Sequence, residues 1–388
     1  MEICENSQCT GCATCANICV HNAISMEEDA YGEIHPVIDT NRCVDCHLCV
    51  NSCHIVNPLS LVSFRKGFAL RIRDIKKYRK SSSGGAAYIL AKSIFEQGGC
   101  LYSVCYNINL RPVVSRCSSL DDFAKFQGSK YVQAYTDFAY REIKQELQSN
   151  LKPLLFIGTP CQVAGLKKYL RKEYSNLYCV DLLCHAVVPY KYFKHEIESH
   201  VKIKDADDCV FRSNDKLNHR FTILNKNRDI LYSRSYLFNK YYLGYYLGVT
   251  HRESCIGCKY ASQNRIGDLT IGDLLGTFDN IHSLNDGKKN SIILVNTSKG
   301  DELIKMIDRD EIYIEAINRQ QILANTPSLK THDISEKWIE FRRYYPKYGY
   351  EVSMKKLVTP YVIRNYLEYP FEWVQYKLKR FKNIFKSV

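Results

Sequence analysis

The sequence CTGCATCANICV, residues 9–20, places four cysteines within eleven residues, and CVDCHLCVNSCH, residues 43–54, repeats the arrangement. Both stretches have the spacing C-x2-C-x2-C-x3-C. Four thiolates that converge from a compact loop are the ligands of an iron–sulfur cluster, because iron and sulfide prefer soft donors. The duplicated spacing therefore predicts two 4Fe–4S clusters in this part of the chain.

The fourth cysteine of such a run points away from the other three and binds the other cluster. We therefore expect each cluster to take three ligands from one run and one from the second. The first set is Cys9, Cys12, Cys15 and Cys53, and the second set is Cys43, Cys46, Cys49 and Cys19. Zinc is disfavoured because its sites use paired C-x2-C units. Cys4 lies outside the spacing and is expected not to be a ligand.

The composition of the chain suits a soluble globular protein of about two to three domains. Of its 388 residues, 45% are hydrophobic and 24% are charged. The sequence has neither a secretory signal nor a run of about eighteen apolar residues, so we expect a cytoplasmic protein. Disulfides are rare in that reducing compartment, and the eighteen cysteines therefore indicate metal or redox chemistry.

The net charge of +13 would suit a nucleic-acid-binding protein. However, each thiolate-bound cluster would add roughly two negative charges, and a bound flavin dinucleotide would add about two more through its pyrophosphate. The Lys and Arg residues are also spread along the chain, which is typical of a solvated surface. We therefore expect no nucleic-acid partner.

Residues 4–58 resemble the bacterial two-cluster ferredoxins, since both the cysteine spacing and its duplication agree with that family. The family usually has proline after the fourth cysteine of each run, whereas this chain has Val20 and His54 there. This departure affects the stiffness of the turn rather than the ligand set. The segment between the runs, residues 23–39, alternates in a way that predicts a short β-hairpin.

After Pro58, ordinary α/β patterning replaces the dense cysteines. The segment SSSGGAAYILAKSIFEQGG, residues 81–99, predicts a Ser/Gly-rich turn followed by a helix. Glycines at a helix N-terminus let backbone amides approach a phosphate, although many such turns bind nothing, so both interpretations stay open. In QGSKYVQAY, residues 127–135, Lys130 could meet a pyrophosphate and Tyr131 could flank a ring. Taken alone, a surface lysine beside a strand is the simpler interpretation.

Four further cysteines lie where sites commonly form in α/β proteins. Cys161 is expected in the first turn of a helix that follows the strand 154–157, and Cys184 at the end of a second buried strand. Cys255 and Cys258 form a C-x2-C pair. The four thiols could hold a third 4Fe–4S cluster or a zinc ion, and the ferredoxin module favours the cluster. The other cysteines of the body are expected to be structural, namely Cys100, Cys105, Cys117, Cys179 and Cys209.

Five segments of the body resemble, in this order, the coenzyme F420 hydrogenase/dehydrogenase beta-subunit family. They are SSGGA (82–86), GSKYVQ (128–133), GTPCQVAGL (158–166), LLCHA (182–186) and CIGCKY with GDLTIGD (255–273). The resemblance implies an α/β flavoprotein with FAD beside a 4Fe–4S cluster. It implies a flavin site at Ser83, Gly84, Gly85, Ser129, Lys130, Tyr131 and Thr159, and cluster ligation by Cys161, Cys184, Cys255 and Cys258.

Taken together, these patterns predict an α+β ferredoxin-like iron–sulfur module followed by an α/β flavin-binding body. The expected divisions are the module at 1–60, two parts of the body at 61–150 and 151–330, and a basic aromatic tail at 331–388. Residues 291–307 predict a strand, a turn and a helix that complete the sheet. The last residues carry one apolar stripe, Val374, Leu378, Phe381, Phe385 and Val388. A helix docked on the protein itself or on a second subunit is the simpler interpretation, and loose attachment to an anionic membrane is the alternative.

The resemblance implies an oxidoreductase that relays electrons between the ferredoxin clusters, FAD and a small-molecule hydride acceptor or donor, such as coenzyme F420 or another compound. Surface-polysaccharide biosynthesis is one setting in which similar proteins occur. The alternative is an electron-transfer adaptor that has no substrate of its own and serves a partner protein or subunit. The direction of electron flow cannot be derived from the sequence, because cluster potentials span roughly −700 to +450 mV.

Overall fold

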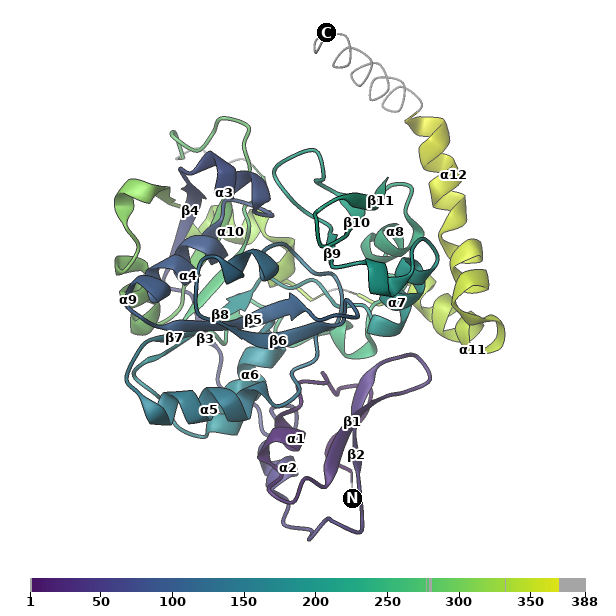
Figure 1. Ribbon diagram of the computed structural model, residues 1–388, viewed down its shortest axis with the longest axis horizontal. Coiled ribbons are helices and arrows are strands. Elements are labelled where there is room, and N and C mark those ends of the chain that lie inside the picture. Colours follow the sequence, from purple (N-terminus) through teal and green to yellow (C-terminus); the bar gives the residue numbers. More distant parts are fainter. Residues whose placement is uncertain (1, 277, 279–280, 332, 370–388) are drawn as a thin grey trace.

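The computed structural model describes residues 2–276, 278, 281–331 and 333–369 (Figure 1). The two cysteine runs form a small module, and each run contains one short helix. These helices are α1 (Thr14–Ile18) and α2 (Leu48–Asn51), and they pack together. Between them lie β1 (Ile24–Glu28) and β2 (Ile34–Ile38), which pair antiparallel. The predicted hairpin is therefore confirmed.

The body is built on one eight-stranded mixed sheet with the strand order β15-β4-β14-β13-β8-β7-β5-β6. Neighbours among the four strands β5, β7, β8 and β13 run parallel, and the flanking neighbours are antiparallel. The strands are β4 (Lys66–Ile72), β5 (Cys100–Tyr106), β6 (Pro112–Cys117), β7 (Leu154–Gly158), β8 (Leu177–Leu182), β13 (Leu269–Asp273), β14 (Ser291–Val295) and β15 (Ile312–Ala316). Because β4 lies between β15 and β14, strands from distant parts of the chain share one core.

Helices cover both faces of this sheet because its central strands are apolar on both sides. Leu155 and Ile157 of β7 pack in the cluster that contains α4 (Ala86–Glu96). The alternate residues Leu154 and Phe156 pack with helices on the opposite face. Those helices are α5 (Ala139–Ser149) and α6 (Pro160–Leu170), which lie on the side toward the cysteine module in Figure 1. The remaining helices around the sheet are α3 (Ile75–Lys80), α9 (Ser298–Lys305) and α10 (Arg319–Asn325).

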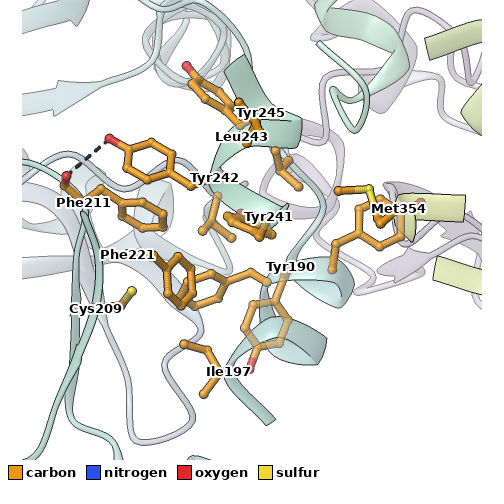
Figure 2. Packing of buried hydrophobic residues seen from close by; sticks show 14 of the residues in the cluster. Tyr190, Ile197, Cys209, Phe211, Phe221, Tyr241, Tyr242, Leu243, Tyr245 and Met354 are labelled. Carbon is orange, nitrogen blue, oxygen red and sulfur yellow. Dashed lines mark hydrogen bonds between the residues drawn. The ribbon is translucent and has the colours of Figure 1, made fainter. Parts of the chain in front are cut away.

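A second layer of packing, rich in aromatic residues, lies beside the sheet (Figures 1 and 2). Its elements are α7 (Tyr190–Glu198), β9 (Asp208–Val210), β10 (Arg220–Leu224), β11 (Ile230–Ser235), α8 (Lys240–Tyr246), α11 (Glu336–Leu357, with a kink at Gly349) and α12 (Thr359–Glu368). Figure 2 shows the Tyr242 hydroxyl donating to the Phe211 carbonyl, at 3.3 Å. The Tyr241 hydroxyl donates to the Tyr131 carbonyl at 2.8 Å, so this lobe supports the loop that carries Tyr131.

Two buried or half-buried arginines join the cysteine module to the body. Arg252, which is 1% exposed, donates to the carbonyl oxygens of Cys9 and Ile34 and to the amide oxygen of Gln133. Arg141 on α5 donates to the carbonyls of Ala16, Asn17 and Cys19 at the end of α1. A guanidinium carries five donors in a planar fork, and both side chains use it to satisfy several backbone acceptors at once. The module is thus held in one orientation against the body.

The predicted elements of the body are confirmed where the structure describes them. The strand 154–157 is β7, the helix that follows it is α6, and residues 291–307 contain β14 and α9. The short strands β3 (Val62–Ser63) and β12 (Asn264–Arg265) pair antiparallel beside the sheet. The apolar stripe predicted from Val374 onward lies outside the described residues. In the described part of the chain, no helix is both long and apolar enough to span a bilayer.

Candidate iron–sulfur centres and cofactor cavity

The first predicted ligand set converges on one small cavity inside the module. Cys9, Cys12, Cys15 and Cys53 all line it, although Cys53 comes from the other run. Burial raises the pKa of Cys12 to about 12 and holds the pKa of Cys15 well above its usual range. Four thiolates can share such a site only with a cation that compensates their charge. The donor set therefore fits a 4Fe–4S cluster.

The two cysteine runs share one backbone conformation. In the first run, Gly11 and Ala13 flank Cys12 and have φ angles of 67° and 61°. In the second run, Asp45 and His47 flank Cys46 and have φ angles of 53° and 57°. The residues on both sides of the second cysteine therefore have a left-handed backbone conformation. This conformation curls the loop, so that successive thiols point inward. Three members of the second predicted set lie near one another, since Cys19 and Cys46 are electrostatic neighbours of Cys49.

Four cysteines of the body also form one group, although they come from three separate segments. Cys161 is the second residue of α6, and Cys184 lies two residues after β8. Cys255 and Cys258 lie on either side of a short turn. The other three thiols are all electrostatic neighbours of Cys184. Burial raises the pKa of Cys161 to about 11 and that of Cys255 to about 12, so this group also requires a compensating cation to ionise.

The spacing of this third group can be compared with the geometry of a zinc site and of a cluster. Thiolates on one tetrahedral zinc ion lie about 3.8 Å apart, as follows from a Zn–S bond of about 2.3 Å. Among the described residues, no three of these sulfur atoms lie within 4.8 Å of one another. Thiolates around a 4Fe–4S cube are held further apart, because each binds a different iron. The four thiols are soft donors of the kind that a 4Fe–4S cluster would take.

A cavity of about 320 Å³ lies next to this third group, at the carboxyl ends of the parallel strands. Its volume lies in the range usual for cofactor sites. Cys161 and Cys184 line it, and so do six of the seven residues expected to bind flavin: Ser83, Gly85, Ser129, Lys130, Tyr131 and Thr159. The cavity therefore brings together segments that lie far apart in the sequence.

Gly84 is the one flavin candidate that does not line the cavity. A Cβ atom at Gly84 would lie 2.0 Å from the carbonyl oxygen of Leu70 and 2.4 Å from the backbone nitrogen of Ser291. Glycine is required there because the turn packs directly on the backbones of β4 and β14. Its neighbour Gly85 precedes α4 with a φ of 94°, a conformation that glycine adopts without strain.

The loop that carries Lys130 and Tyr131 is tied to its surroundings. The Ser129 amide and hydroxyl both contact the Ser82 hydroxyl, at 2.9 and 3.1 Å. The Lys130 amine donates to the carbonyls of Phe126 and Gln127 in its own loop, and burial lowers its pKa. Lys130 is thus a half-buried lysine that lines the cavity.

Several cavity residues carried no clear signal in the sequence. Tyr245 packs on Tyr131 with ring centroids 4.5 Å apart. Asp273 accepts a hydrogen bond from Arg212 at 2.8 Å, and Arg212 also donates to the Tyr131 hydroxyl at 3.2 Å. Gln162 completes a capping box with Thr159 at the start of α6. Only that box has a local pattern, a threonine followed three residues later by glutamine, that could have marked it.

The module and the body meet close to the cavity. Cys12 lines the cavity as well as the first cluster site. Gly165, one turn of α6 after Cys161, packs on the module, where a Cβ atom would lie 3.1 Å from the Cys12 Cβ and 2.7 Å from the Thr14 hydroxyl. Because Cys161 and Gly165 are four residues apart, they share one face of α6, and the first and third cysteine groups lie along that face.

Within the described residues, a group of two carboxylates and one imidazole in the hairpin could also hold a metal ion. Single ligand atoms of Asp29, Glu33 and His35 lie within 4.8 Å of one another. The Glu33 carboxylate already accepts hydrogen bonds from Arg342 and from the Glu253 amide, while Asp29 accepts from two amides of its own turn. These hydrogen bonds explain the group without a metal ion, because they connect the hairpin to the body and stabilise its turn.

The five cysteines expected to be structural lie in strands away from these groups. Cys100 and Cys105 lie in β5, Cys117 in β6, Cys179 in β8 and Cys209 in β9, and all five are buried. All eighteen cysteines are free thiols in the structure.

Comparisons with known proteins agree with both resemblances. Residues 151–320 match the family model for the C-terminal part of the coenzyme F420 hydrogenase/dehydrogenase beta chain, and residues 8–55 match a 4Fe-4S dicluster domain. Among solved structures, a chain of the F420-reducing NiFe hydrogenase complex from Methanosarcina barkeri, studied by xenon derivatization, is similar in fold. Its TM-score is 0.47 at 16% identity, over 74% of this chain and 93% of that chain. No curated protein matches the sequence. Residues 151–320 are thus similar to that beta-subunit family, and residues 8–55 are similar to dicluster 4Fe-4S domains.

Proposed function

We propose that this iron–sulfur protein is a flavin-dependent oxidoreductase, in which electrons pass between the two N-terminal clusters, a third cluster and an FAD bound in the 320 Å³ cavity. One observation carries the proposal. A single cavity is lined by six of the flavin candidates, by two cysteines of the third group and by one cysteine of the first group. A cofactor in that space would therefore contact residues next to two clusters.

The start of α4 supports a phosphate-binding role in this proposal. Gly85 precedes this eleven-residue helix, and Ser83 and Gly85 line the cavity. The amides at a helix N-terminus favour a negative charge, because they have no partner within the helix. The Ser82 hydroxyl fixes Ser129 against the same turn. The two loops would therefore be preorganised to hold a pyrophosphate.

The remaining walls suit a ring system that must be kept from water. Ile157, Leu182 and Ile271, from three neighbouring strands, line the cavity beside Tyr131 and Tyr245. Apolar walls exclude water and strengthen the electrostatic interactions inside. When bound, FAD would supply the conversion between hydride transfer and the single-electron chemistry of the clusters. In this role the protein positions the cofactors and prevents leakage of electrons.

The stoichiometry of the reconstituted protein tests this proposal. We expect about twelve irons per chain, four for each of three clusters, together with one flavin. Anaerobic reconstitution followed by iron, sulfide and flavin assays measures both numbers. About eight irons without flavin would contradict the enzyme and leave an electron carrier.

An electron-transfer adaptor without its own substrate is the second candidate. It is favoured by the exposed edge of the module, where Cys46 is exposed, Val44 is 59% exposed and Val20 is 75% exposed. Apolar residues beside an accessible cluster suit the docking of a partner protein or subunit. Reduction of a deazaflavin or another small acceptor by the isolated protein would count against the adaptor.

The family description names coenzyme F420, and a deazaflavin of that class is the hydride partner that we propose to test first. In this scheme residues 1–60 carry the two ferredoxin clusters, residues 61–330 hold FAD and the third cluster, and residues 331–388 form the tail. A setting in surface-polysaccharide biosynthesis and a membrane contact of the tail stay predictions from the sequence.

A further inference from the structure

The first cluster site contains a fifth thiol. Cys4 lines the same cavity as Cys9, Cys12, Cys15 and Cys53. Its side chain packs against the buried cluster that contains Cys15, Cys49 and Cys53, and Cys9 and Cys53 are its electrostatic neighbours. A 4Fe–4S cube has four irons and takes one protein ligand at each. The site therefore offers one thiol more than the cluster needs.

The segment that carries Cys4 is held in place by its neighbours. Ile3 is 5% exposed and packs in the cluster that contains Cys15, Cys49 and Cys53. The amide of Cys9 donates to the carbonyl of Glu5 at 3.0 Å, which closes a tight turn between Cys4 and Cys9. The contact between Cys4 and the ligand set thus follows from packing and turn geometry.

We propose that Cys4 is a reserve ligand of the first cluster, able to replace Cys53 on one iron. The inference rests on the proposed cluster at Cys9, Cys12, Cys15 and Cys53. Cys53 is the ligand to be exchanged because Cys4 packs against the cluster that contains it and because it is the only member of its set that comes from the second run.

The exchange conserves atoms, charge and electrons. The thiol of Cys4 gives its proton to the sulfur of Cys53, the bond between iron and Cys53 breaks, and a bond between iron and Cys4 forms. Iron changes neither its oxidation state nor its number of thiolate ligands. The consequence is a cluster that survives the loss or displacement of Cys53 but not the loss of a ligand outside the reach of Cys4.

Paired variants of the full-length reconstituted protein test this inference. We expect Cys53→Ala to keep the iron content of the wild type, and Cys53→Ala combined with Cys4→Ala to lose about four irons. Cys12→Ala is the matched control, because it should lose about four irons whether or not Cys4 is present. Electron paramagnetic resonance of the reduced protein identifies which cluster is lost, and thermal unfolding of each variant checks the fold.

Alkylation under native anaerobic conditions gives a readout that does not depend on iron content. Mass spectrometry should find Cys4 labelled by iodoacetamide in the wild-type holoprotein and protected in the Cys53→Ala holoprotein. Equal iron loss in the single and double Cys53 variants, or labelled Cys4 in both proteins, would overturn the reserve ligand alone. A wild-type protein without the N-terminal clusters would overturn the proposed site as well.

Discussion

His54 explains a departure from the ferredoxin pattern at the scale of one residue. It stands where the related ferredoxins usually have proline, and it is 0% exposed. Its ring nitrogens contact the hydroxyls of Thr10 and Tyr260 at 3.1 and 2.8 Å, and its carbonyl accepts from Lys259 at 2.6 Å. Burial lowers its pKa to about 3, so the ring is neutral and can donate through one nitrogen and accept through the other. The position therefore joins the module to the body.

Replacement of His54 should weaken this joint. His54→Ala leaves buried hydroxyls of Thr10 and Tyr260 without a partner, and we expect the free energy of unfolding to fall by about 1–3 kcal/mol. Denaturant unfolding of the holoprotein measures the change. His21→Ala, which alters an exposed histidine of the same module, should have little effect. Equal stability of both variants would show that the hydrogen bonds of His54 contribute nothing to the free energy of unfolding.

His219 gives the body a dependence of stability on pH. Burial and the nearby Arg212 lower its pKa to about 4, and one ring nitrogen lies 3.1 Å from the Tyr246 hydroxyl. In the unfolded chain the imidazole of His219 is protonated below about pH 6.5, whereas in the folded protein it is protonated only below about pH 4. Stability contributed at this site is therefore complete above pH 6.5 and is lost as the pH falls toward 4.

The His219→Gln variant tests that dependence. Between pH 6.5 and 4, the melting temperature of the wild type should fall more steeply than that of the variant, because glutamine does not titrate. Above pH 7 the difference between the two should be constant. Parallel curves through the whole range would contradict the assignment to His219.

Helix α6 is the element on which the site depends. Its first turn carries Cys161, and its residue Gly165 packs on the module beside Cys12. The strand, turn and helix around it could be predicted, since a buried strand, a Gly-Thr-Pro turn and an N-terminal proline are local patterns. The convergence of Cys9, Cys12, Cys15 and Cys53 could also be predicted, since it follows from the repeated cysteine spacing.

The rest of the site could not be predicted, because it depends on contacts between distant segments. Cys161, Cys184 and Cys258 meet only because β7 and β8 are adjacent and the C-x2-C segment returns to their ends. The bond between His54 and Tyr260 spans 206 residues and has no local signal. The surroundings of Lys130 have the same origin, since its amine lies 5.4 Å from the ring centroid of Tyr106, which the local sequence does not indicate.

A Gly165→Ala substitution tests the close packing of α6 on the module. Alanine would favour the helix by about 1 kcal/mol, but its Cβ would lie 2.7 Å from the Thr14 hydroxyl and 2.9 Å from the Tyr140 hydroxyl. We expect overpacking to cost about 1–3 kcal/mol and to produce a net loss of stability, measured by thermal unfolding.

Gly244→Ala in α8 is the matched control for this substitution. Its Cβ would meet the flexible end of Met354 at 2.6 Å, which can move aside. The control should therefore change stability little. A Gly165→Ala protein as stable as the control would contradict the close contact.

At the scale of the whole molecule, the three cysteine groups and the cavity form a continuous series. The second group lies at the exposed edge with Cys46, and Cys15, Cys49 and Cys53 share one buried cluster between the two module sites. Cys12 lies between the first site and the cavity, which Cys161 also lines. Such an order suits the transfer of single electrons from a partner at the surface to a cofactor inside.

Flavin reduction by a reduced ferredoxin protein, followed by stopped-flow absorbance, tests this series most directly. A protein donor is too large to enter the cavity, so its electrons must arrive through the clusters. In the wild type we expect the N-terminal clusters and then the flavin to be reduced, and Cys105→Ser should behave in the same way. Cys258→Ser should lose about four irons and slow flavin reduction on the order of tenfold or more, while its N-terminal clusters are still reduced. Flavin reduction at the wild-type rate in Cys258→Ser would contradict the relay through the third cluster.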